Sequence, residues 1–251
     1  MNRFFAFGCS FTVSHDRPTW ADIVGREFDF YENWGRSGAG NQYIFNQLIE
    51  CNAQRKFTAD DTVIIMWTSI SREDRYVKNL GGWIGQGSVY NFYNKEAYSE
   101  DWVKKFSCER GYLIRDLATI AAARDLLEYW GVKYKFLAMM PLANPSELRE
   151  YQNISGDNQD LIKLYQDVLL EIKPSVYEII FNSQNWNQKL SKFGAWVHDG
   201  IRDPHPDPYE ALEYIQTVLP EMSLSQDTID YVNNFKLGDP APEFFLTIQR
   251  L

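Results

Sequence analysis

Short apolar runs alternate with longer amphipathic segments along the chain. The apolar runs have the length and composition of strands buried on both faces of a parallel sheet, and they predict strands at residues 3–7, 28–32, 62–67 and 132–138. Elsewhere apolar side chains recur at helical spacing, which predicts helices at residues 18–28, 41–54, 112–129, 160–172, 208–219 and 224–235. Strand and helix alternate in chain order, so we predict an α/β fold with a doubly wound, mainly parallel sheet flanked by helices.

The sequence has the organisation of one domain. No internal repeat, low-complexity tract or flexible linker interrupts residues 1–251. Residues 76–110 break the alternation, because they are rich in aromatic residues and glycine and show no sustained period. We interpret them as an insertion over the sheet, and the segment at about 224–236 as an extra C-terminal helix. Pro18 suits the first turn of its helix, and Gly131 is placed to end another.

Charge and cysteine content exclude several classes of function. The 25 Lys and Arg residues against 34 Asp and Glu give a net charge of −9, which repels a phosphate backbone, so we expect no nucleic-acid partner. No apolar run approaches the roughly 20 residues that cross a bilayer. The apolar stretch at residues 4–7 is shorter than that of a signal peptide, so we expect no membrane partner. The three cysteines show no disulfide or metal-binding spacing, which favours the reducing cytoplasm.

Candidate chemistry lies at the carboxyl ends of the predicted strands, where parallel α/β sheets bind their ligands. Ser10 directly follows the first strand, Gly38 lies in a glycine-rich loop after the second, and Ser69 follows the third. All three positions combine small side chains with exposed backbone N–H groups. This combination is typical of sites where a nucleophile attacks beside donors for an oxyanion.

Histidine supplies the candidate base for a serine nucleophile. Of the three in the chain, at positions 15, 198 and 205, only His205 lies in a loop stiffened by prolines and lined by carboxylates that can orient an imidazole. These carboxylates are Asp199, Asp203 and Asp207. We favour Asp203, because a single turn brings it to the ring. Asp207 precedes Pro208 at the start of a predicted helix, and we expect it to cap that helix.

Short blocks around these residues resemble the SGNH or GDSL hydrolases, a family of esterases, lipases and carbohydrate deacylases. Residues 7–12 (FGCSFT) are similar to the block with the nucleophilic serine, and residues 33–38 (NWGRSG) to the block whose last glycine donates a backbone N–H to the oxyanion. Residues 203–206 (DPHP) are similar to the block that completes the triad. The resemblance implies a flavodoxin-like three-layer sandwich and a triad of Ser10, His205 and Asp203, with Gly38 in the oxyanion hole. It calls for no cofactor and no metal ion.

Three features depart from the family pattern. Cys9 stands where the family usually has Asp, and Asp203 and His205 are two residues apart instead of three. The block after the third strand normally brings an Asn side chain to the oxyanion hole, whereas this chain has Thr68 and Ser69 there. We therefore expect a hole made mainly of backbone N–H groups, with Ser69 as a weaker side-chain donor.

We assign three further residues near the strand ends to substrate binding, namely Asn41, Trp67 and Arg72, of which Arg72 suits an anionic group. The resemblance implies a small-molecule or glycan ester as substrate, so the leading interpretation is a serine-dependent ester hydrolase. Two alternatives stay open. One is a metal-dependent hydrolase in which Asp203, His205 and Asp207 bind a divalent ion. The other is a non-catalytic glycan-binding module on the same fold.

Overall fold

The computed structural model describes residues 2–13, 17–84, 87–90, 98–142, 158–181, 197–198, 201–202 and 205–236. At its centre is a sheet of four parallel strands, in the order β2 (Phe30–Asn33), β1 (Arg3–Phe7), β3 (Thr62–Trp67) and β6 (Lys133–Ala138). In this register Phe5 lies between Glu32 of β2 and Val63 of β3. The sheet confirms the predicted α/β fold, and its strand order matches the first four places of the flavodoxin-like order.

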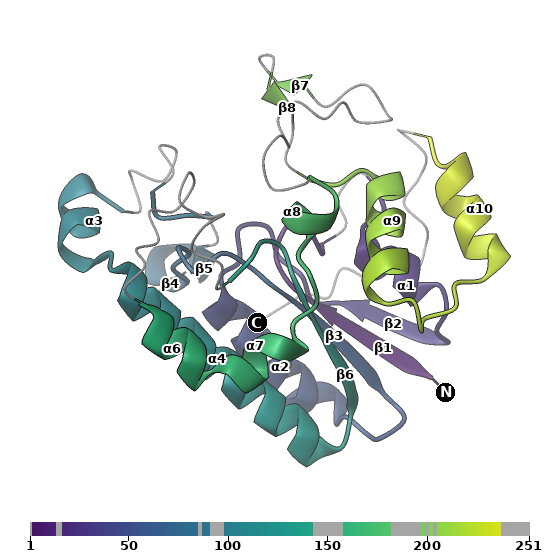
Figure 1. The fold of residues 1–251 in the computed structure, drawn as a ribbon, viewed down its shortest axis with the longest axis horizontal. Coiled ribbons are helices and arrows are strands. Elements are labelled where there is room, and N and C mark those ends of the chain that lie inside the picture. The colour runs from purple at the N-terminus through teal and green to yellow at the C-terminus, as the bar shows by residue number, and fades with distance from the viewer. Residues whose placement is uncertain are drawn as a thin grey trace.

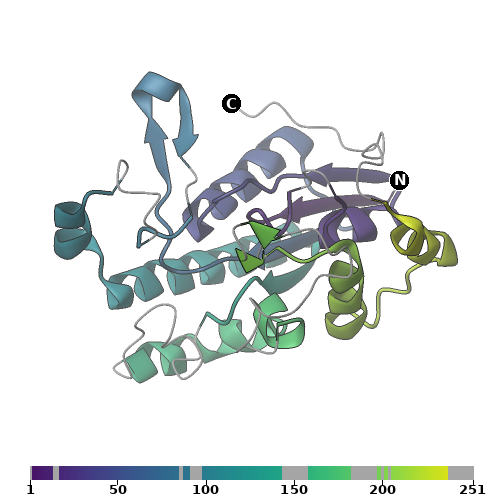
Figure 2. The same ribbon diagram turned by 90° about the horizontal axis from the view of Figure 1, so that it is seen from above.

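Helices cover both faces of this sheet, as Figures 1 and 2 show. One layer holds α1 (Trp20–Gly25) and α9 (Pro208–Val218), with α10 (Gln226–Asn234) packed on α9. The other holds α2 (Asn41–Arg55) and α4 (Glu109–Trp130), with α6 (Gln159–Leu164) and α7 (Gln166–Glu171) along α4. None of the helices in the described ranges, α4 with its 22 residues included, is long and apolar enough to cross a membrane.

Aromatic side chains of β1 anchor both helical layers. Phe4 faces the α1 side, where its ring stacks on that of Tyr31 with the ring centroids 5.3 Å apart. Phe5 faces the opposite side and contacts the ring of Phe57, at 5.0 Å between centroids. Both phenylalanines are fully buried. Because successive side chains of a strand point to opposite faces, this central strand is apolar throughout.

The elements outside the main sheet gather near its carboxyl end. The predicted insertion contains the antiparallel strands β4 (Arg75–Val77) and β5 (Gly82–Ile84), the 3-10 helix η1 (Lys78–Leu80) between them, and α3 (Glu100–Phe106). Figure 2 shows the β4–β5 hairpin projecting away from the sheet. Helix α8 (Val176–Ile179) and the antiparallel pair β7 (Val197–His198) and β8 (Ile201–Arg202) lie beyond the carboxyl ends of the strands (Figure 1).

The first helix is shorter than predicted. It begins at Trp20, behind the N-cap Thr19, whose backbone N–H donates to the carboxylate of Asp22 at 2.7 Å. Pro18 therefore precedes the cap, and its predicted place in the first turn is wrong. The helix ends at Gly25 instead of continuing to residue 28, because the chain turns there to enter β2.

Other boundaries differ from the prediction as well, and α4 begins at Glu109, three residues before its predicted start. The second strand starts at Phe30 and not at residue 28, so it is shifted toward its carboxyl end. The predicted helix at 160–172 consists of two short helices, because the backbone of Tyr165 leaves the helical conformation. Gly131 ends α4 in the left-handed conformation, with φ 67°, as predicted.

Candidate active site

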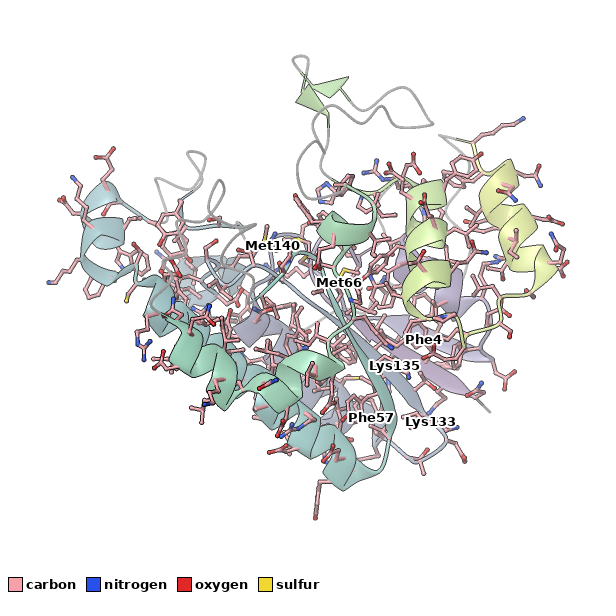
Figure 3. All side chains as sticks on the ribbon, in the orientation of Figure 1. Phe4, Phe57, Met66, Lys133, Lys135 and Met140 are labelled. Atoms are coloured by element: carbon pink, nitrogen blue, oxygen red, sulfur yellow. The ribbon has the colours of Figure 1, made fainter. Side chains whose placement is uncertain are left out.

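The residues singled out from the sequence lie at one end of the sheet. Parallel pairing brings the carboxyl ends of the four strands to a common edge, so the loops that follow them are neighbours. Met66 in β3 and Met140 just after β6, both labelled in Figure 3, mark this edge. Hydrogen bonds join the loops directly, and the N–H of Arg36 donates to the carbonyl of Gly8 at 3.0 Å.

Ser10 lies in a tight turn directly after β1. The N–H groups of Thr12 and Val13 both donate to the carbonyl of Cys9, at 2.9 and 3.1 Å, and close the turn around Ser10. Gly8 permits this close approach, because a Cβ at its position would lie 2.1 Å from the Thr12 hydroxyl oxygen. The Ser10 side chain is half-buried, and none of the described residues hydrogen-bonds its hydroxyl. The turn thus fixes the backbone of Ser10, while its hydroxyl has no partner among the described residues.

Asn33, the last residue of β2, ties the Ser10 turn to the loop that holds Gly38. Its Nδ2 donates to the carbonyl of Thr12 at 2.7 Å, and its Oδ1 accepts from the N–H of Gly35 at 2.9 Å. Thr12 is held a second time by Trp20, whose Nε1 donates to the threonine hydroxyl at 3.2 Å. One amide side chain therefore connects two loops of the site. Asn33 was not predicted as a site residue, although the sequence places it at the end of a predicted strand.

Gly38 has a left-handed backbone, with φ 72°, which glycine adopts without strain. Shortly after it Gly40 caps α2, and the Asp74 carboxylate accepts from the N–H groups of Gly40 at 2.8 Å and Tyr43 at 2.9 Å. Burial raises the pKa of Asp74 against the effect of these hydrogen bonds. In the part of the chain that the structure describes, the N–H groups of Gly38 and Ser10 donate to no protein acceptor.

The hydroxyl of Ser69 belongs to a chain of serine hydroxyls. Its Oγ lies 2.9 Å from that of Ser71 and also accepts from the N–H of Ser71, and Ser71 donates in turn to Ser88. Thr68, the other residue at the position of the family's Asn, is fully buried, and its hydroxyl donates to the sulfur of Met139 at 3.6 Å. The assignment of Ser69 as an oxyanion donor stays a prediction.

Two of the residues assigned to substrate binding occupy core positions. The Nδ2 of Asn41 donates both to the carbonyl of Thr68 at 3.1 Å and to the carboxylate of Asp116 at 2.7 Å, so both of its N–H bonds are engaged. Trp67 is fully buried, and its ring meets that of Phe136 edge-on with centroids 5.6 Å apart. These are the contacts of residues that position the loops. Their contact with substrate remains a prediction.

Arg72 lies between the loops that follow β2 and β6. Its Nη1 donates to the carbonyl of Ala39 at 2.8 Å, and its Nη2 lies 3.6 Å from the sulfur of Met139. The same sulfur accepts from the thiol of Cys9 and the hydroxyl of Thr68, both at 3.6 Å, a role for Met139 that the sequence did not indicate. Arg72 forms no ion pair with any described carboxylate. Its positive charge favours the ionised form of the nearby Asp74 carboxylate, and its contact with an anionic group stays a prediction.

His205 lies beside the Ser10 turn. Its ring packs against that of Phe11, the residue after Ser10, with centroids 4.9 Å apart and planes tilted by 45°. Phe11 also stacks on Tyr177 of α8, at 6.2 Å. Within the described ranges no hydrogen bond joins Ser10 to His205, and catalytic hydrogen bonds often close only around a substrate. The fold thus brings the predicted nucleophile and base to the same corner of the sheet.

Asp203, Asp199 and His15, which the sequence singled out, lie outside the described residues. Asp207 is the N-cap of α9, as predicted. Its side chain accepts from the N–H of Glu210 at 2.9 Å, and its own N–H donates to the Glu210 carboxylate at 3.0 Å. Among the described residues, no cluster of three or more His, Cys, Asp or Glu side chains is arranged to hold a metal ion.

Comparison with known proteins finds similarity among solved structures. The chain is similar to a member of the lipolytic protein G-D-S-L family from Veillonella parvula, with 14% identity over 86% of this chain and 97% of that chain, and a TM-score of 0.45. It is similar to an acetylxylan esterase from Geobacillus stearothermophilus, solved as a catalytic mutant, with 13% identity over 89% of this chain and 95% of that chain, and a TM-score of 0.47. A GDSL-like lipase from Bacteroides thetaiotaomicron gives 14% identity, coverage of 88% and 86%, and a TM-score of 0.42. No family model and no curated protein matches the sequence.

Proposed function

We propose that this protein is a serine-dependent hydrolase of carboxylic esters, with a small-molecule or glycan ester as substrate. The main support is the convergence of three features at one end of the sheet. Ser10 follows the central strand, the N–H groups of Ser10 and Gly38 have no described protein acceptor, and the His205 ring packs beside the Ser10 turn. A nucleophile, a base and oxyanion donors are the parts that acyl transfer needs. The resemblance of the sequence blocks to SGNH hydrolases favours the same roles.

In the proposed reaction the Ser10 hydroxyl oxygen attacks the ester carbonyl carbon while His205 takes the hydroxyl proton. The N–H groups of Ser10 and Gly38 hold the negative charge that develops on the carbonyl oxygen. His205 then gives its proton to the leaving alcohol as the C–O bond breaks, and the acyl group stays on Ser10. A water molecule, deprotonated by His205, attacks this acyl-enzyme and releases the acid, which restores both side chains.

Asp203 is the proposed partner of the second ring nitrogen of His205. A carboxylate in this position fixes the tautomer of the imidazole and stabilises the imidazolium that forms during catalysis. The N-cap bond of Asp207 supports this choice, because its carboxylate already accepts from the backbone of α9. Asp199 remains the alternative partner.

Hydrolysis of p-nitrophenyl acetate tests the proposal. We expect Ser10→Ala and His205→Asn each to lower kcat/KM by more than about a hundredfold. The double variant should be no slower than the slower single variant, because residues that act as a unit are not additive. Ser107→Ala is the matched control, since this serine hydroxyl donates to the carbonyl of Val103 in α3 and lies outside the proposed machinery.

The same assay separates the alternatives. Activity that survives Ser10→Ala and is abolished by a chelator would replace the proposal by a metal-dependent hydrolase using Asp203, His205 and Asp207. Glycan binding without hydrolysis of any ester would instead favour a non-catalytic module. Activity that survives both Ser10→Ala and a chelator would assign the nucleophile to another residue.

A further inference from the structure

A buried carboxylate in the middle of α4 connects two side chains that hold the loop after β3. Asp116 is 1% exposed, and its two oxygens accept from Asn41 Nδ2 at 2.7 Å and from Arg115 Nε at 2.6 Å. Asn41 belongs to α2 and Arg115 to α4, so the carboxylate also joins two helices of one layer. None of these three residues has a direct part in the proposed acyl transfer.

Both partners of Asp116 hold the backbone of residues 68–72. The Oδ1 of Asn41 accepts from the N–H of Thr68 at 2.8 Å, and its Nδ2 donates to the carbonyl of the same residue at 3.1 Å. The Nη2 of Arg115 donates to the carbonyls of Ile70 at 3.0 Å and Arg72 at 2.9 Å. Four hydrogen bonds therefore fix one short loop from two side chains. This loop contains Ser69 and Arg72, the candidates for oxyanion and substrate contacts.

We propose that Asp116 is a positioning residue of the candidate active site, which sets the conformation of the 68–72 loop through Asn41 and Arg115. The inference rests on the proposed function of the site. The carboxylate fixes which way the Asn41 amide points, because only its NH₂ group can donate to Asp116. A reversed amide would place its oxygen against Asp116 and its NH₂ against the N–H of Thr68. Both hydrogen bonds between Asn41 and Thr68 would then be lost.

The charge of Asp116 is sensitive to pH in the range where enzymes work. Burial raises the pKa of Asp116 to about 6, against the hydrogen bonds from Arg115 and Asn41, and the nearby Asp74 carboxylate raises it further. Glu73 faces the same arginine, with 3.2 Å between Oε1 and Arg115 Nη1. Asn41 and Arg115 each donate a hydrogen bond to one oxygen of the Asp116 carboxylate. A proton bound to either oxygen therefore removes the acceptor of one of these two bonds. Burial favours the protonated form, whereas the two hydrogen bonds are made to the charged form, so we expect the loop, and not the fold as a whole, to loosen as the pH falls through about 6.

Asp116→Asn tests the inference, because asparagine has the shape of a protonated aspartate. The measurement is the ratio of kcat/KM between the parent protein and the variant from pH 5 to pH 8. Below pH 6 we expect the two proteins to have similar kcat/KM. Above pH 6 we expect kcat/KM of the parent to exceed that of the variant by about tenfold or more, mainly through kcat. Leu127→Ala is the control, a buried position of the same helix outside the network, and its ratio should not change with pH.

Hydrogen exchange at the Thr68 amide gives a second readout that needs no activity. This N–H donates to Asn41, so its exchange should be faster in Asp116→Asn than in the parent at pH 7.5. Asn41→Ala keeps the pair between Asp116 and Arg115 and should speed the exchange of the same amide. This variant replaces Asp116→Asn in the measurement if Asp116→Asn does not fold. A ratio that is constant with pH, or a Thr68 amide with unchanged exchange, overturns the inference while leaving the role of Ser10 intact. Faster exchange in a protein without esterase activity would support positioning by Asp116 and refute the proposed function instead.

Discussion

Replacing Asn33 with alanine tests how the Ser10 turn is held beside the Gly38 loop. The substitution removes two short hydrogen bonds, from Nδ2 to the carbonyl of Thr12 at 2.7 Å and from the N–H of Gly35 to Oδ1 at 2.9 Å, and a long one from Nδ2 to Asp22 Oδ1 at 3.5 Å. The loss of each short bond lowers the free energy of unfolding by a different amount. The Thr12 carbonyl keeps the hydroxyl of Thr19 as a donor at 2.7 Å, whereas the buried Gly35 N–H has no other acceptor in the described part of the chain.

The expected loss of stability follows from these partners. A buried N–H without an acceptor costs about 1–3 kcal/mol, and loss of one bond to a carbonyl that keeps another partner costs about 0.5–1.5 kcal/mol. We therefore expect Asn33→Ala to lower the free energy of unfolding by roughly 2–4 kcal/mol. Because the Asn33 amide hydrogen-bonds both the Ser10 turn and the Gly38 loop, its loss should also lower kcat, by about tenfold to a hundredfold.

Urea unfolding and p-nitrophenyl acetate hydrolysis measure the two effects on the same samples. Asn52→Ala is the matched control, since the Asn52 side chain accepts a single backbone hydrogen bond, from the N–H of Phe57 at 2.9 Å, at the far end of α2. It should destabilise the protein by about 1–2 kcal/mol and leave kcat unchanged. A loss below about 0.5 kcal/mol for Asn33→Ala, or an unchanged kcat at the expected loss of stability, would refute the reasoning.

Three further substitutions probe the site and the stability of the fold. Ser69→Ala should lower kcat by up to about a hundredfold to a thousandfold with KM nearly unchanged, and an unchanged kcat would assign the oxyanion to backbone groups, Thr68 or Asn41. Asp207→Ala should lower stability by about 1–2 kcal/mol in thermal unfolding through loss of the α9 cap, and activity that becomes dependent on added metal would contradict this role. Burial raises the pKa of Asp61, but the hydrogen bonds from Arg3 outweigh burial and hold this pKa below its usual value. The Asp61 carboxylate therefore stabilises the fold at neutral pH and loses that effect as the pH falls through its folded pKa. Asp61→Asn should therefore be less stable than the parent at pH 7 by about 2 kcal/mol, with a difference that shrinks below pH about 4, and a difference independent of pH would contradict the pairing.

The central strands were predictable because their environment leaves a direct mark on the sequence. Residues 3–7 and 62–67 are apolar at almost every position, as strands covered on both faces must be, and both strands have the predicted bounds. Helix ends depend on single residues instead. The break at Tyr165 interrupts an apolar period that continues on both sides, so periodicity alone does not reveal it. The four-residue α8 is too short to show any period.

The site was predictable to the extent that topology determines it. Parallel pairing places the loops with Ser10, Gly38 and Ser69 at one edge whatever their contacts are, and this placement needs only the strand order. The contacts that hold the loops depend on tertiary structure. Asn41 and Asp116 are 75 positions apart, and no local pattern indicates that an amide in one helix meets a carboxylate in another.

Covalent labelling of the full chain with a fluorophosphonate probe, followed by mass-spectrometric mapping of the modified residue, tests the central claim most directly. We predict a single labelled site at Ser10, with labelling abolished in Ser10→Ala and strongly slowed in His205→Asn, because the probe reports a serine activated by a base. Labelling at a different serine, or an unlabelled protein that nevertheless hydrolyses esters, would contradict the assignment of Ser10 as the nucleophile.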